Sequence, residues 1–151
     1  MSEQTSSGVM AGKRGLIMGV ANDRSIGWGI ASKLAEHGAE LAFTFQGEAL
    51  QKRVIPLAES VGSNLVLPCD VTHEASVDAV FDRLKSEWGE LDFVLHAIAY
   101  SDKEELKGGY VDTSRDNFQR TMDISVYSFT EITRKATAMM KDGGSLLTLT
   151  Y

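Results

Sequence analysis

The chain has 151 residues, with 15 basic and 21 acidic side chains and a formal net charge of −6. Apolar residues make up 43% and charged residues 24%, which is ordinary for a globular domain and excludes a disordered chain. The acidic balance also argues against nucleic acid as the main partner, because phosphate binding requires a basic surface.

The N-terminal segment and the single cysteine bear on the compartment. The first residues, MSEQTSSG, lack the basic start and apolar core of a signal peptide, and the longest apolar runs are too short to span a membrane. Cys69 cannot form an internal disulfide, which favours a reducing compartment. We therefore expect a cytoplasmic protein with no membrane association, made of a flexible N-terminal tail at residues 1–11 and one domain at residues 12–151.

Short apolar runs alternate with helical patterns along the chain. Strands are predicted at residues 16–20, 41–46, 65–69, 91–97 and 146–151. Between them, apolar spacing predicts helices within residues 30–37, 50–61, 72–88 and 114–140, the first of which stops at Gly38. This alternation predicts a parallel sheet covered by helices on both faces, that is, a doubly wound, Rossmann-like α/β domain of three layers.

Three of the predicted helices show further features in their sequence. Pro56 predicts a kink or a break in the second helix, because proline removes a backbone hydrogen bond. Thr72 is predicted to cap the third helix. The long fourth helix is expected to bury a stripe made of Phe118, Met122, Val126, Phe129, Ile132, Thr133, Ala136 and Met140.

Ligands of such sheets bind beyond the carboxyl ends of the strands, so the residues after each strand are the candidates for function. Gly19 follows the first strand, and Gly27 and Gly29 open the next helix. Glycines let the backbone approach a phosphate, and the helix N-terminus supplies N–H donors. The spacing differs from G-x-G-x-x-G, and an ordinary strand-to-helix turn is the alternative.

The second strand is followed by Gln46, where dinucleotide-binding folds usually carry an acidic residue for NAD or a nearby basic residue for NADP. The neutral amide with no adjacent Lys or Arg favours NAD over NADP. Asp70 and Val71 follow the third strand. The Asp70 carboxylate could accept a hydrogen bond from an adenine amino group while Val71 packs on the ring, or Asp70 could cap the next helix.

The histidines and the single cysteine are expected to have structural roles. The histidines are not at ligand spacing, so no metal site is predicted, and His96 is expected to be a strand-end histidine satisfied by hydrogen bonds. Cys69 is expected to be a small buried apolar residue rather than a reactive thiol. Tyr100 and Ser101 begin a loop that could line a substrate cleft.

Taken together, these segments resemble the short-chain dehydrogenase/reductase superfamily. More closely, they are similar to the bacterial enoyl-acyl-carrier-protein reductases of type II fatty acid synthesis. The resemblance is carried by GVANDRSIGWGIA (residues 19–31), GAELAFTFQ (38–46), LPCDV (67–71), HAIAY (96–100), DISVYSF (123–129) and GSLLTLTY (144–151). The widened glycine loop is typical of those reductases and atypical of the wider superfamily.

The resemblance implies hydride transfer from NADH to the β-carbon of a trans-2-enoyl thioester on acyl carrier protein, with a tyrosine hydroxyl stabilising the resulting enolate. It further implies a homotetramer, in which the long helix from Ser114 packs between subunits. The implied residue roles are Gly19, Ser25 and Ile26 around the pyrophosphate, Gln46 at the adenosine ribose, Asp70 and Val71 at the adenine, Ile98 at the nicotinamide-side ribose, Ser101 near the thioester and Tyr151 as the active-site tyrosine that lines the acyl pocket.

The family's second active-site tyrosine and its lysine come after the position of Tyr151. We therefore expect these 151 residues to be the N-terminal part of a longer enzyme, and a polypeptide limited to them to be inactive. NADH oxidation with a crotonyl thioester by that polypeptide would refute this expectation. The alternative is a non-catalytic dinucleotide-binding module that is complete at 151 residues. A methyltransferase is less favoured, since it would want an acidic residue in place of Gln46.

Overall fold

The computed structural model describes residues 8–150 of the chain. Its centre is a five-stranded sheet in the order β3-β2-β1-β4-β5, in which every neighbouring pair is parallel. The strands are β1 (Arg14–Met18), β2 (Glu40–Phe45), β3 (Val66–Pro68), β4 (Phe93–His96) and β5 (Ser145–Thr148). The predicted doubly wound α/β fold and its five strands are confirmed, with strand ends shifted by one to three residues.

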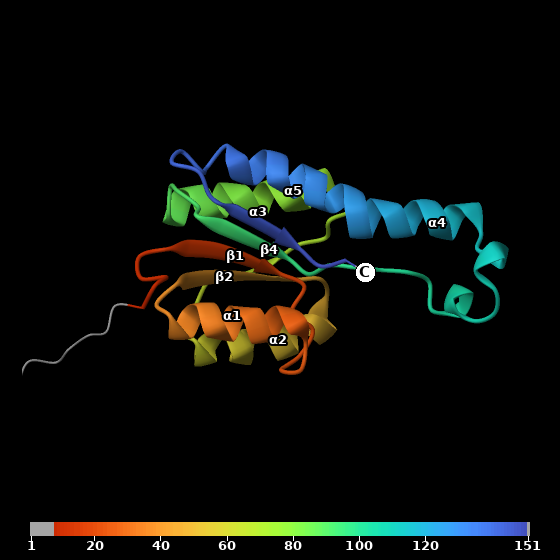
Figure 1. The fold of residues 1–151 in the computed structure, drawn as a ribbon, viewed down its shortest axis with the longest axis horizontal. Coiled ribbons are helices and arrows are strands. Elements are labelled where there is room, and N and C mark those ends of the chain that lie inside the picture. The colour runs from red at the N-terminus through yellow and green to blue at the C-terminus, as the bar shows by residue number, and fades with distance from the viewer. Residues whose placement is uncertain (1–7, 151) are drawn as a thin grey trace, which may run out of the picture.

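Helices cover both faces of the sheet, so that two apolar cores form (Figure 1). One face packs against α1 (Ile26–Glu36) and α2 (Glu48–Ser60), and the other packs against α3 (Glu74–Glu87) and α5 (Ser128–Thr137). Alternation along β1 explains the two cores, because Leu16 and Met18 face one side while Ile17 faces the other. All three side chains are fully buried.

The predicted break at Pro56 does not occur, since α2 runs from Glu48 to Ser60 with Pro56 inside it. Proline leaves the carbonyl four residues earlier, that of Lys52, without its helical partner. Lys52 and Pro56 are both exposed, so water can solvate that carbonyl and the helix continues. The predicted cap of α3 is also wrong, because the helix begins one residue later than expected, with His73 at its N-cap position.

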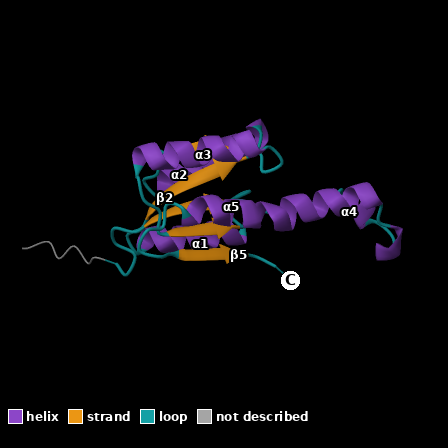
Figure 2. Ribbon diagram, turned by 90° about the horizontal axis from the view of Figure 1, so that it is seen from above, coloured by secondary structure: helices purple, strands orange, loops and turns teal. Residues whose placement is uncertain are grey.

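The predicted long helix is divided into three parts. α4 (Arg115–Met122) is followed by a π-helical turn, η3 (Asp123–Tyr127), and then by α5. Both views show α4 extending past the carboxyl ends of the strands (Figures 1 and 2). The first half of the expected buried stripe is therefore wrong: Phe118, Met122 and Val126 are 43–50% exposed, because no other part of the described chain covers α4. Ile132, Ala136 and Met140 are buried as expected.

Two short 3-10 turns, η1 (Glu104–Leu106) and η2 (Tyr110–Asp112), lie in the polar stretch before α4. At the other end, residues 8–11 form a turn in which the Met10 N–H donates to the His37 carbonyl. The division into a tail at residues 1–11 and a domain at residues 12–151 stays a prediction.

Candidate functional site

A cavity of about 570 Å³ lies beyond the carboxyl ends of β1, β2, β3 and β4. Its wall is built from the segments that end or follow these strands, with one side chain each from α2 and the π turn: Gly19, Val20, Ala21, Thr44, Phe45, Gln46, Leu50, Cys69, Asp70, Val71, Thr72, Ala97, Ile98, Ala99, Tyr100 and Ile124. The helices that connect β1, β2 and β3 cover one face of the sheet, and α3, which leads to β4, covers the other. The switch point therefore lies between the neighbouring strands β1 and β4, which is where open α/β sheets bind ligands.

The cavity brings together five of the predicted site residues, namely Gly19, Gln46, Asp70, Val71 and Ile98. Ser25, the N-cap residue of α1, and Ile26, its first residue, do not line the cavity, and Ile26 is 67% exposed. Ser101 follows the last lining residue of the β4 loop. Tyr151 lies outside the described residues.

Gly19 is required by geometry on two counts. Its φ of +97° lies in the left-handed region that side chains disfavour. A Cβ atom at this position would also overlap the carbonyl oxygen of Ala97 on the adjacent strand end. The segments after β1 and β4 therefore approach each other more closely than any residue with a side chain would allow.

The N-terminus of α1 is open to a ligand. Ser25 occupies the N-cap position, but its Oγ atom donates to the Asn22 carbonyl at 2.7 Å and does not cap the helix. The first turn contains no acidic residue. Its backbone N–H groups and the helix dipole are therefore free to attract an anion such as a phosphate.

Asp70 lines the cavity and its carboxylate is held by its neighbours. Its Oδ1 atom accepts hydrogen bonds from the Thr72 N–H at 2.9 Å and from the Thr72 hydroxyl at 2.6 Å, and its Oδ2 atom lies 3.3 Å from His73 Nδ1. The hydrogen bonds from Thr72 lower the pKa of the Asp70 carboxyl, so it carries a negative charge at neutral pH. Asp70 thus orders the turn before α3 while lining the cavity, but it does not cap α3, whose N-cap residue is His73 and which has no side-chain cap.

Cys69 and His96 fit their predicted structural roles. Cys69 is buried, and desolvation raises the pKa of its thiol to about 11, which makes it unreactive at neutral pH. His96, fully buried at the end of β4, places Nδ1 2.9 Å from Thr148 Oγ1 and Nε2 2.7 Å from Ser128 Oγ. The histidine therefore joins β5, β4 and α5 just beneath the cavity.

The sequence reasoning missed several residues that shape the site. Thr44, Leu50 and Ile124 line the cavity, and although Thr44 and Ile124 belong to segments that carry the resemblance, none of the three was named as a site residue. Asn117 was also missed: it is 6% exposed on α4, donates to Ser101 Oγ at 3.1 Å and accepts from the Asp102 N–H at 2.8 Å. No local signal marked Asn117, because α4 is mostly polar in sequence, RDNFQRTM, and the partners of Asn117 lie 15 and 16 residues away.

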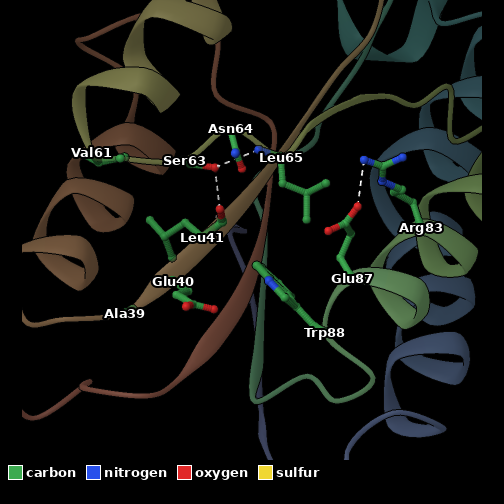
Figure 3. Close-up of a pocket in the computed structure, with 11 residues that line it drawn as sticks. Ala39, Glu40, Leu41, Val61, Ser63, Asn64, Leu65, Arg83, Glu87 and Trp88 are labelled. Carbon is green, nitrogen blue, oxygen red and sulfur yellow. Dashed lines mark hydrogen bonds and ion pairs between the residues drawn. The ribbon is translucent and has the colours of Figure 1, made fainter.

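A second cavity of about 420 Å³ opens near the amino ends of β2 and β3, beside the end of α3 (Figure 3). Four of its polar side chains are engaged with the protein itself. Arg83 pairs with Glu87 at 2.8 Å, Glu40 pairs with Arg14 at 2.8 Å, and Ser63 Oγ bonds the Leu41 carbonyl.

Within residues 8–150, no helix has the length and apolar character needed to cross a membrane. The same residues contain no group of three His, Cys, Asp or Glu side chains that could hold a metal ion.

Comparison with known proteins gives consistent matches. The family model for enoyl-(acyl carrier protein) reductase matches residues 19–151. Among curated relatives, enoyl-[acyl-carrier-protein] reductase [NADH] 1 of Rhizobium meliloti (strain 1021) is 64% identical over 97% of this chain and 54% of its own length. The chain thus spans about half the length of the curated relatives it matches.

Solved structures agree with the fold. The crystal structure of FabI from Candidatus Liberibacter asiaticus has a TM-score of 0.93 and 56% identity, over 95% of this chain and 56% of the other. The reductase of Anaplasma phagocytophilum, solved in complex with NAD, has a TM-score of 0.92 and 56% identity, over 96% of this chain and 56% of the other.

Proposed function

Because the chain belongs to the enoyl-(acyl carrier protein) reductase family, we propose that the protein carrying it reduces the trans-2 double bond of enoyl thioesters on acyl carrier protein, with NADH as the reductant. The observation that carries this proposal is the cavity at the carboxyl ends of the strands, whose wall combines Gly19, Gln46 and Asp70 with two apolar side chains, Val71 and Ile98. NADH, when bound, supplies the hydride.

The chemistry of the cavity fits a dinucleotide along its length. The close approach of Gly19 to Ala97 leaves bare backbone beside the open N-terminus of α1, which suits a pyrophosphate. The ionised Asp70 is an acceptor for an amino group, and Val71 is an apolar surface for a ring. These groups support the assignment of NADH to the cavity.

Each remaining residue has one proposed role. We propose that Gln46 binds the adenosine ribose hydroxyls and that Ile98 contacts the nicotinamide-side ribose. Ser25 and Ile26 would hold the pyrophosphate through the backbone of the turn before α1. Ser101 would meet the substrate near its thioester, and Tyr151 would line the acyl pocket.

The proposed role of Gln46 predicts a change of cofactor preference. Gln46→Arg should raise the affinity for NADPH relative to NADH by about tenfold to a hundredfold, because a guanidinium forms charge-assisted hydrogen bonds with the 2′-phosphate. Titrations with both cofactors measure this ratio. Gln51→Arg is the control, because it places the same charge on an exposed residue of α2 that does not line the cavity. An equal change in both variants would contradict the role of Gln46.

The proposed activity is tested by following NADH consumption with a crotonyl thioester of acyl carrier protein. For the longer protein that carries this sequence, we expect NADH consumption that depends on both the protein and the enoyl thioester. The saturated butyryl thioester is the inactive control. NADH binding without any reduction would contradict the proposal and favour the non-catalytic module.

We further propose a cytoplasmic homotetramer. The support is the apolar surface of α4 and the π turn, where Phe118, Met122, Val126 and Tyr127 are 43–50% exposed. A contiguous apolar patch on a protruding helix is typical of an interface between copies of a chain.

A further inference from the structure

The Ser125 hydroxyl binds both backbone groups of Tyr100. Its Oγ atom accepts a hydrogen bond from the Tyr100 N–H at 3.0 Å and donates one to the Tyr100 carbonyl at 3.2 Å. Residues 97–102 belong to no helix or strand. The Ala97 N–H donates to the Met18 carbonyl, whereas Tyr100 and Asp102 are held by side chains from outside the loop. One serine from a distant helical segment thus sets the path of the loop that forms one wall of the cavity.

The serine lies in the π turn, which is itself fixed to the sheet. The backbone N–H that ends this turn at Ser128 bonds the carbonyl of Asp123, five residues earlier. The Ser128 hydroxyl donates to the Ile124 carbonyl at 2.6 Å and also lies 2.7 Å from His96 Nε2. The buried end of β4 therefore holds the turn that carries Ser125.

Asn117 holds the next two residues of the same loop through Ser101 Oγ and the Asp102 N–H. Together, Ser125 and Asn117 fasten three successive loop residues to the α4–π segment. Ile124, the neighbour of Ser125, lines the cavity directly. The α4–π segment thus contributes one side chain, Ile124, to the wall of the cavity and two side chains that hold residues 100–102.

We propose that Ser125 is a positioning residue for the reduction: it holds the backbone of Tyr100, the residue before Ser101, so that the enoyl thioester meets the nicotinamide end of the cavity in one placement. Ser125 does not line the cavity and acts through the loop. This inference rests on the proposed function and assigns a role to a segment outside the proposed cofactor contacts.

The test compares three variants in the protein that carries this sequence. Ser125→Ala removes both bonds to Tyr100, Ser125→Thr keeps the hydroxyl, and Ser60→Ala removes a serine hydroxyl bonded to its own helix at the remote end of α2. For Ser125→Ala we expect kcat/KM for the crotonyl thioester to fall about tenfold. The Kd for NADH should change less than threefold, because the adenosine and pyrophosphate contacts are untouched. Ser125→Thr should recover most of the loss.

Three results would overturn the inference: kcat/KM unchanged in Ser125→Ala, an equal loss of NADH affinity, or a Ser125→Thr variant as defective as the alanine variant. Hydrogen exchange at the Tyr100 amide separates this inference from the proposed activity. Ser125→Ala should accelerate that exchange about tenfold, whereas Ser60→Ala should not, even if no enoyl thioester is reduced. Unchanged exchange in Ser125→Ala would refute the positioning role.

Discussion

Replacing Gly19 by alanine should destabilise the fold by about 2 to 5 kcal/mol and abolish measurable NADH binding. The added Cβ would sit in a left-handed backbone conformation and would overlap the Ala97 carbonyl oxygen. Relief of this overlap requires the segments after β1 and β4 to separate, and both line the proposed cofactor cavity. Urea unfolding measures the stability loss, and NADH fluorescence titration measures binding.

Gly62→Ala is the matched control for this prediction. Gly62 has a similar positive φ of +77°, but nothing lies within 4 Å of its would-be Cβ atom, and it lies beside the second cavity. The Gly62→Ala substitution should lower the free energy of unfolding by about 1 kcal/mol, from backbone strain alone, and leave NADH binding intact. If Gly19→Ala behaves like Gly62→Ala, the close approach of the two segments is not essential.

His96→Leu should lower the free energy of unfolding at pH 8 by about 2 to 4 kcal/mol. The substitution leaves the hydroxyls of Ser128 and Thr148 without their imidazole partner at a fully buried position. His37→Leu, at an exposed histidine, should change stability by less than about 0.5 kcal/mol. Urea denaturation of both variants makes the comparison.

The stability that His96 contributes should decrease as the pH falls. Burial lowers the pKa of His96 below its ordinary value of 6.5, so the folded state holds the imidazole neutral. As the pH falls through 6.5, the unfolded state takes up the proton first, and this part of the stability is lost. The difference between the original protein and His96→Leu should therefore be smaller at pH 5 than at pH 8. A constant difference would contradict a buried neutral His96.

The sequence was sufficient for the parts of the fold that follow from local pattern. Apolar runs located all five strands, and Gly38 marked the end of the first helix, where it adopts the positive φ that such ends favour. Parallel strands place their carboxyl ends at one edge, so Gly19, Gln46, Asp70, Val71 and Ile98 could be grouped before any coordinates.

Other features depend on contacts that no local pattern encodes. The stripe from Phe118 to Met140 is periodic, yet only its second half meets the sheet, since α4 extends past the carboxyl ends of the strands. The π turn is bonded to β4 through the hydroxyl of Ser128 and the imidazole of His96, two residues that are 32 positions apart in sequence. The roles of Asn117 and Ser125 depend on a loop 15 to 25 residues away in sequence.

The central claim is that NADH binds at the carboxyl ends of β1 to β4. Hydrogen–deuterium exchange of the protein with and without NADH tests it directly. We expect NADH to slow exchange in residues 19–26, 44–50, 69–72 and 97–101, with no change in residues 61–65 and 83–88 beside the second cavity. Protection confined to the second cavity, or absent from all of these segments at saturating NADH, would contradict the claim.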